Sequence, residues 1–392
     1  MRAAEQGSAA RPVILVNLDS LDPGFHSYVT GPGAGRRRDV ILLRDELDGV
    51  VVDVNDVRDD RLARLAGRLA GGYVGLAVAA FRRRRGASVY VTMTENEAIV
   101  LGALLKVSRL RIPVVAVGHY PAQASKWAAW RVARVHTHID RILVLGSAQG
   151  DRLVDHFGVP RDKVEFLPLG IDTHYWSADR ATPRRLDRPY VVAAGLQHRD
   201  HRTVANAVQG LGVDLLVAAA SPWSTTGNEF EQADPPPGVL VEQPDLDALR
   251  DAYAGAIAVV TSTVETDFPA GTTTVLEGMA LGKPAVVSRT VGGGNYVADR
   301  RRVLRRGPLR STSAAVAARG PSAGSQGQTG FYFAPGDVEG LRDVLGWIRD
   351  HPMEAATVGV QGRRVVEEVH SLEAFVARIG DVVREVTARP QP

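Results

Sequence analysis

The chain of 392 residues contains no cysteine. Disulfide bonds, thiol nucleophiles and zinc sites built from cysteine are therefore excluded. It also lacks a run of eighteen apolar residues, which the sequence would need for a predicted membrane-spanning helix. Residues 1–8 have no apolar segment of the secretory-signal type. From these absences we expect a soluble, cytoplasmic protein without a transmembrane anchor.

Lysine is scarce as well, because only four of the 47 basic residues are lysine. This skew toward arginine is typical of a GC-rich genome and indicates no particular function. The formal net charge of +3 permits an anionic substrate or peripheral contact with a membrane, and requires neither. We expect no nucleic-acid partner. With 45% hydrophobic and 23% charged residues, the chain can build about two domains with large cores.

Short apolar runs alternate with helical patterns along the chain. Strand-like runs occupy residues 13–17, 50–54, 88–92, 112–120, 139–145, 190–194, 215–218, 239–242, 256–260 and 285–288. A long helical pattern covers residues 62–81, and another helix begins at Glu95. This alternation predicts an α/β fold in which a mostly parallel sheet is covered on both faces.

The most informative stretch runs from Ala270 to Ser288. A glycine turn at Gly271 precedes a helix of about two turns, and a short apolar strand follows Pro284. An apolar run lies before this stretch too, so the helix begins at the carboxyl end of a strand, where α/β proteins bind ligands. The N–H groups at Gly271, Thr272 and Thr273 favour a phosphate there.

Glu277 falls inside the same helix, within reach of hydroxyl groups on whatever carries that phosphate. A phosphate combined with a diol indicates the ribose of a nucleotide. The alternative is an ordinary β-α-β unit in which Glu277 points to solvent.

Residues 273–287 resemble the donor-binding segment of retaining GT-B glycosyltransferases of family 4. That segment has a Glu, seven residues, and a second Glu in a Leu-Glu-Ala-Met-Ala context, followed by Gly-x-Pro-Val-Val. Here Glu277 takes the place of the second Glu, and Gly282-Lys283-Pro284 begins the closing motif. The resemblance covers residues from about 88 to 385.

The resemblance implies a GT-B architecture, in which two Rossmann-like domains face a cleft. It divides the chain into an acceptor-side domain at 1–178, a linker at 179–188, a nucleotide-sugar domain at 189–370, and a helix at 371–392 that returns to the first domain. The implied reaction moves a sugar from a nucleoside-diphosphate sugar to an acceptor hydroxyl with retention of the anomeric configuration. The acceptor is a small molecule or a lipid-linked one.

Individual site residues follow from the same resemblance. His119 ends a strand at the position where relatives place a catalytic-site histidine facing the transferred sugar. Arg199 aligns with one cation of the diphosphate clamp, while Leu196 replaces the other. Gly293 lies in the expected glycine-rich turn after Ser288. We expect no metal ion and no cofactor, because Arg199 and helix N–H groups can stabilise the leaving charge.

One departure from the family pattern concerns the first Glu, because Pro269 stands eight positions before Glu277. Either Asp267, or Glu265 in the same loop, replaces the missing carboxylate, or the position is vacant. A vacancy would suit a deoxysugar, whose apolar edge could meet Pro269. The departure also leaves open a non-catalytic protein that binds nucleotide sugars, or a sugar-nucleotide epimerase or hydrolase.

Two further segments stand outside these motifs. Residues 300–328 contain seven arginines and no acidic residue, so we expect an insertion that is mobile when free. Residues 125–134 predict a helix with Trp127 and Trp130 on one side. That face is either core or a contact with lipid headgroups.

Overall fold

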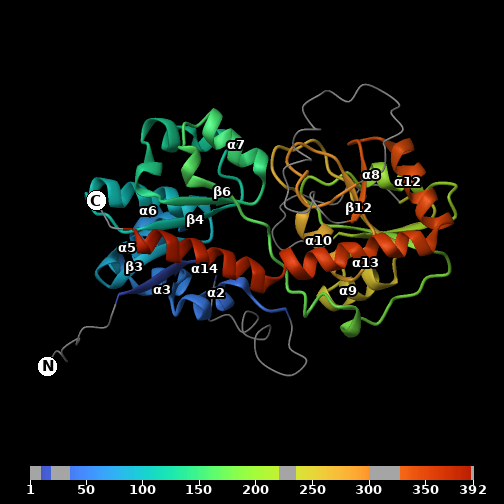
Figure 1. Cartoon of the computed structure of the whole chain (residues 1–392), viewed down its shortest axis with the longest axis horizontal. Helices are drawn as coiled ribbons and strands as arrows, with labels where there is room; N and C mark the ends of the chain where they lie inside the picture. The colour runs from blue at the N-terminus through green and yellow to red at the C-terminus, as the bar shows by residue number, and fades with distance from the viewer. Residues whose placement is uncertain (1–9, 19–35, 220–234, 300–326, 390–392) are drawn as a thin grey trace. The chain divides into compact units, whose positions relative to one another are not determined.

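The computed structural model describes residues 10–18, 36–219, 235–299 and 327–389. Almost all of the 300–328 insertion lies outside these residues. The chain divides into two compact units (Figure 1). Unit 1 comprises residues 1–145, 149–170 and 372–392, and unit 2 comprises residues 146–148 and 171–371.

Unit 1 contains a six-stranded parallel sheet in the order β2-β1-β3-β4-β5-β6. Its strands are β1 (Arg11–Leu15), β2 (Val50–Val52), β3 (Ala87–Thr92), β4 (Val114–Gly118), β5 (Arg141–Val144) and β6 (Val164–Phe166). Its helices are α2 (Asp39–Leu47), α3 (Val54–Asp59), α4 (Arg61–Ala70), α5 (Gly72–Arg82), α6 (Glu95–Val107), α7 (Ser147–Asp155) and α14 (Leu372–Ala388). The division assigns the first two residues of α7 to unit 2.

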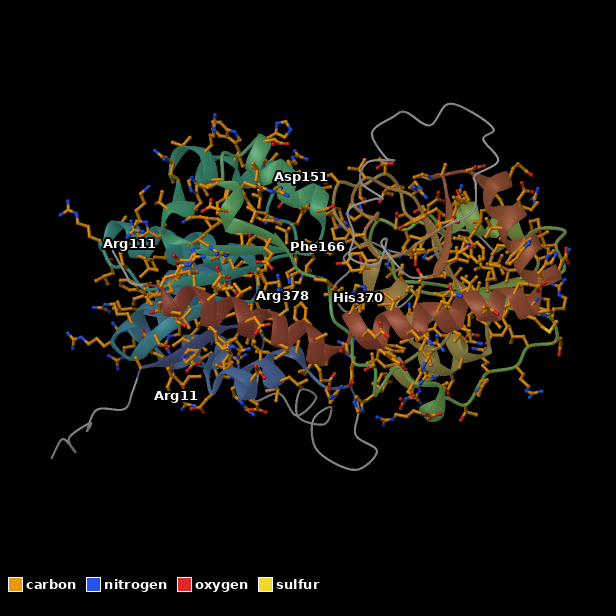
Figure 2. All side chains as sticks on the ribbon, viewed as in Figure 1. Arg11, Arg111, Asp151, Phe166, His370 and Arg378 are labelled. Atoms are coloured by element: carbon orange, nitrogen blue, oxygen red, sulfur yellow. The ribbon has the colours of Figure 1, made fainter. Side chains whose placement is uncertain are left out.

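Successive residues of the unit 1 strands enter different cores, as the two-residue period of a strand requires. Val13 and Leu15 pack with α5 and α6 on one face, while Ile14 packs with α2 and α14 on the other. The last helix, α14, lies beside α2 (Figure 1). Arg378 of α14, labelled in Figure 2, forms an ion pair with Glu165 of β6.

Unit 2 contains a second six-stranded parallel sheet in the order β12-β11-β10-β7-β8-β9. Its strands are β7 (Tyr190–Ala194), β8 (Asp214–Ala218), β9 (Val239–Glu242), β10 (Ala258–Thr261), β11 (Ala285–Ser288) and β12 (Gly330–Phe333). Its helices are α8 (His201–Val208), α9 (Leu246–Gly255), α10 (Thr272–Ala280), α12 (Val338–Asp350) and α13 (Pro352–Val369). This strand order is that of a Rossmann fold, with its switch point between β7 and β10.

The α/β class and the two Rossmann-like sheets are thus as the sequence predicted. Helices α8 and α12 share a core with one face of the unit 2 sheet, and α10 packs against β10 and α13. No helix among the described residues is long and apolar enough to cross a membrane.

Two expected helices differ from the structure. The pattern at 62–81 forms two helices, α4 and α5, because Gly71 ends α4 with φ +101°. Asp60 caps the start of α4. Residues 125–134 do not form a regular α-helix: a 3₁₀ turn at Ala124–Lys126 is followed by a π-type turn at Ala128–Val132. Trp130 is fully buried and donates its indole N–H to the Pro121 carbonyl at 2.9 Å, whereas Trp127 is exposed.

The expected linker at 179–188 belongs structurally to unit 2, which begins at Ile171. Tyr175 donates its hydroxyl hydrogen to Asp247 of α9 at 2.7 Å. Arg184 forms a two-pronged ion pair with Glu242 at the end of β9. These contacts fix the segment against α9 and β9, within the compact unit that begins at Ile171.

Candidate functional site

Two loops of unit 2 meet at the switch point of its sheet. One follows β7 and carries Arg199, and the other follows β10 and leads to α10. An isolated antiparallel bridge joins Arg199 to Thr263. Its hydrogen bonds are reinforced by the Asp200 N–H, which donates to the Ser262 carbonyl at 3.0 Å. The backbone itself therefore holds the Arg199 loop beside the entrance to α10.

Helix α10 begins without a side-chain cap at Gly271, which has φ +80°. A Cβ atom on Gly271 would lie 2.4 Å from the Thr261 methyl carbon and 3.2 Å from Cζ of Arg199, so only glycine fits. The Thr272 hydroxyl donates to the Pro269 carbonyl at 2.9 Å, while Thr273 is exposed. The first N–H groups of the helix are thus left for an external anion.

The guanidinium of Arg199 lies against this helix start. Its Nε donates to the Ala194 carbonyl at 2.8 Å, and its Nη2 lies 3.5 Å from the Thr274 hydroxyl. Within the described ranges Arg199 forms no ion pair. Burial lowers its pKa to about 10, against the opposing influence of Tyr253 and Glu277. Arg199 therefore stays charged at neutral pH and adds a positive charge to the helix N-terminus.

Glu277 is buried about one and a half turns after the start of α10. Its Oε2 lies 3.5 Å from the hydroxyl of Tyr253, a fully buried residue of α9. Burial, and then the nearby Glu277, raise the pKa of Tyr253 well above its ordinary value, so the phenol remains a hydrogen-bond donor. The sequence predicted Glu277 as a ligand-binding group but missed Tyr253, whose only signal is a lone tyrosine on the buried face of α9.

Two more residues that the sequence analysis missed shape the Arg199 loop. Gly195 has φ +89°, and a Cβ there would lie 2.9 Å from Nη2 of Arg199. His201 is buried and bonds through Nε2 to the Gly195 carbonyl at 2.8 Å. Burial lowers the pKa of His201 to about 4, so the ring is neutral and Nε2–H donates. Gly195 and His201 together shape the turn that holds Arg199.

The loops after β10 and β11 pack on each other. The Val291 N–H donates to Glu265 at 2.9 Å, so this carboxylate is already engaged. Gly292 sits so close to the Phe268 backbone that a Cβ would lie 2.2 Å from its carbonyl oxygen. The Gly293 N–H donates to the Thr290 hydroxyl at 3.1 Å, and Asp267 is partly buried in the facing loop. Both carboxylates considered for the missing Glu thus lie in the loop between β10 and α10, Glu265 exposed and Asp267 partly buried.

His119 belongs to unit 1, where it directly follows β4. Its N–H donates to Glu95 at 2.9 Å, and its Nε2 lies 3.1 Å from the Met93 carbonyl. Since a carbonyl only accepts, Nε2 carries a hydrogen. Glu95 is buried and pairs with Lys126; burial raises its pKa, but Lys126 outweighs that influence and lowers it. The backbone of His119 is thus anchored, and the ring is exposed.

Glu97 lies beside this cluster, fully buried at the start of α6. It accepts the Thr94 N–H at 3.2 Å, and its other oxygen has no hydrogen-bond partner in the described part of the chain. Burial raises the pKa of Glu97 to about 8. At neutral pH the group is therefore mainly protonated, which suits a structural role in the helix cap.

This raised pKa predicts that the stability of the fold decreases as pH rises from weakly acidic to weakly basic values. Between the ordinary pKa of a glutamate and about 8, the folded chain holds a proton that the unfolded chain releases, so stability falls as pH rises. We expect Glu97→Gln, which cannot ionise, to reduce the fall in unfolding free energy between pH 6 and pH 9 by roughly 1 to 3 kcal/mol. Urea denaturation at several pH values measures how the unfolding free energy of each protein changes with pH. Equal slopes for both proteins would contradict the prediction.

No three His, Asp or Glu residues in the described ranges cluster as a metal ion would require.

Comparison with known proteins adds to these observations. Residues 36–175 match the model of Glycosyltransferase Family 4. The MMP alpha-(1->4)-mannosyltransferase of Mycolicibacterium hassiacum is 23% identical over 325 residues, covering 75% of this chain and 70% of that protein.

Solved structures share the fold at low sequence identity. A glycosyltransferase from Rickettsia africae has a TM-score of 0.62 at 11% identity, covering 98% of this chain and 100% of that one. Anabaena HepE in complex with UDP-glucose has a TM-score of 0.62 at 12% identity, covering 95% and 99%. Together with the family match and the mannosyltransferase relative, the shared GT-B fold supports the expected resemblance: this chain is a glycosyltransferase that is similar to those of family 4.

Proposed function

We propose that the enzyme transfers a sugar from a nucleoside-diphosphate sugar to an acceptor hydroxyl with retention at the anomeric carbon. The observation that carries the proposal is the charged Arg199 at the uncapped start of α10, about one and a half turns before the buried Glu277. A diphosphate matches Arg199 and the helix start, and a ribose diol matches the Glu277 carboxylate. The complex of Anabaena HepE with UDP-glucose supports a donor of this class.

In the proposed reaction the bond between the anomeric carbon and the diphosphate oxygen breaks, a bond to the acceptor oxygen forms, and the proton of the acceptor hydroxyl passes to the departing diphosphate. The departing diphosphate gains negative charge, which Arg199 and the N–H groups of Thr272 and Thr273 stabilise. Glu277 holds the ribose, and His119 contacts the transferred sugar. The acceptor is a small molecule or a lipid-linked one. We propose that no metal ion or cofactor takes part.

A panel of nucleoside-diphosphate sugars tests the proposal, with release of nucleoside diphosphate measured with and without candidate acceptors. Acceptor-dependent release supports transfer, release without acceptor indicates a hydrolase, and binding without release indicates a non-catalytic protein. NMR coupling constants of the product report the anomeric configuration, and excess EDTA tests the metal. The panel includes hexoses and deoxy analogues, because we propose that the position of the missing Glu is vacant beside Pro269.

Glu277 should matter more for donor binding than for the fold. Glu277→Gln removes a charged acceptor of ribose hydrogen bonds, and such bonds contribute about 1.5 to 3 kcal/mol. We expect nucleoside-diphosphate affinity, measured by calorimetry, to fall at least about tenfold. Thermal stability should change little, because glutamine keeps the size of the side chain and an acceptor for Tyr253.

A control at Tyr253 separates binding from packing. Tyr253→Phe removes only the hydroxyl beside Glu277 and should lower affinity by a smaller factor than Glu277→Gln. Unchanged affinity in Glu277→Gln would remove this residue from the donor site.

A further inference from the structure

Helix α4 of unit 1 packs against the protein through its small residues and exposes its leucines to solvent. Its small residues face the protein: Ala63 is fully buried, and Gly67 lies against Gly75 of α5. Its large residues face outward, since Leu62, Leu65 and Leu69 are 56%, 53% and 79% exposed. A helix that merely covered the core would show the opposite arrangement.

The three leucines form one stripe. Positions 62, 65 and 69 follow the spacing of residues on one helix face, so their side chains lie next to one another. Tyr73, 37% exposed, follows just beyond the Gly71 turn. Single exposed leucines are common, but three together on one short helix indicate a surface that is covered in use.

Positive charge runs alongside the leucine stripe. Arg61, Arg64 and Arg68 are all exposed, and α4 contains no acidic residue. Arg61 and Arg68 form no hydrogen bond or ion pair within the described ranges, while Arg64 donates to the Arg58 carbonyl at 2.7 Å.

Of the acidic side chains nearest the start of α4, two form ion pairs with arginines outside the helix. Asp60 pairs with Arg82 and Asp56 pairs with Arg83, whereas Asp59 is exposed. The two ion pairs leave the arginine row of α4 as the main local charge.

We propose that α4 docks this enzyme on an anionic lipid surface, with the leucines entering the headgroup boundary and the arginines meeting lipid phosphates. The combination of an apolar stripe and an adjacent row of arginines fits such a surface. A second copy of the chain fits less well, because pairing two α4 helices would bring like charges together. The inference is independent of the donor sugar and needs no transfer assay.

Flotation of the full chain with vesicles tests the proposal. Vesicles of phosphatidylcholine alone are compared with vesicles that also contain about 30 mol% phosphatidylglycerol. We expect binding to the anionic vesicles only, and weaker binding at high salt. The triple variant Leu62→Ser, Leu65→Ser, Leu69→Ser should lower the partition coefficient at least about tenfold, because it removes the apolar contact.

A matched control changes exposed apolar residues elsewhere: Val107→Ser, Met353→Ser and Val360→Ser together should leave flotation unchanged. These positions are 85%, 80% and 51% exposed. Arg61→Glu with Arg68→Glu keeps the leucines and should abolish the preference for anionic vesicles, which provides a second test if the leucine variant unfolds.

Three outcomes would overturn the proposal. The first is that the wild-type chain does not float with anionic vesicles. The second is that the leucine variant and the charge-reversed variant both float as well as the wild type. The third is a dimer in sedimentation that the leucine variant dissociates, without any flotation, which would assign the stripe to a second copy.

Discussion

Arg199→Ala is expected to weaken the affinity for a nucleoside diphosphate by roughly 10- to 100-fold, because hydrogen bonds to a charged group contribute about 1.5 to 3 kcal/mol each. Affinity for the free nucleoside should change less than about threefold, since the nucleoside lacks the phosphates that Arg199 would meet. Calorimetric titration with both ligands measures the difference. The expectation rests on a charged guanidinium that forms no ion pair within the described ranges and lies at the start of α10.

Two variants accompany this experiment. Arg202→Ala removes an exposed arginine from the first turn of α8, three residues after Arg199, and should leave both affinities unchanged. Arg199→Lys keeps the charge but loses the planar fork, so we expect an intermediate loss. If Arg199→Ala lowered the affinities for nucleoside and nucleoside diphosphate equally, Arg199 would be a structural residue that merely supports the loop.

The strands and the start of α10 could be predicted from the sequence because their signals are local. A buried parallel strand such as β10 is a continuous apolar run, and Gly271 marks the turn before a helix. Glu277 follows from its spacing within that helix. Each of these inferences needed only a few neighbouring residues.

The rest of the site depends on contacts between distant segments. Tyr253 approaches Glu277 from another helix, and Gly195 matters because the Arg199 side chain folds back over it. His201 looks like an ordinary first-turn residue until its bond to the Gly195 carbonyl is seen. Residue types alone do not encode these approaches, so the sequence indicated the groups that we propose to bind the donor and missed the residues that hold them.

The incorrect helix predictions have a similar cause. Leu62, Leu65 and Leu69 are hydrophobic at helical spacing, which normally predicts a core-facing stripe within one long helix. The structure turns that stripe outward, because the glycines of α4 and α5 allow the two backbones to pack closely through their small residues instead. Hydrophobic periodicity identifies a face, and tertiary packing decides what that face meets.

Gly271→Ala is expected to have the largest effect on the site. The alanine must keep φ near +80° and place its Cβ 2.4 Å from the buried Thr261, so either α10 or β10 has to shift. We expect a loss of roughly 2 to 4 kcal/mol in unfolding free energy from strain and overpacking combined. Moving the helix start should also reduce nucleoside-diphosphate affinity more than about 100-fold, since Arg199 and the N–H groups shift with it.

Gly282 provides the matched control, because it follows the same helix with φ +70° and a Cβ there would meet nothing within 4 Å. Gly282→Ala has the backbone strain without the clash, so it should cost only about 1 kcal/mol and leave affinity unchanged. Thr261→Ser removes the methyl group that the new Cβ would strike. Combined with Gly271→Ala, it should recover part of both the stability and the affinity. Equal effects of Gly271→Ala and Gly282→Ala, measured by urea denaturation and calorimetry, would show that the close approach at the start of α10 does not constrain the site.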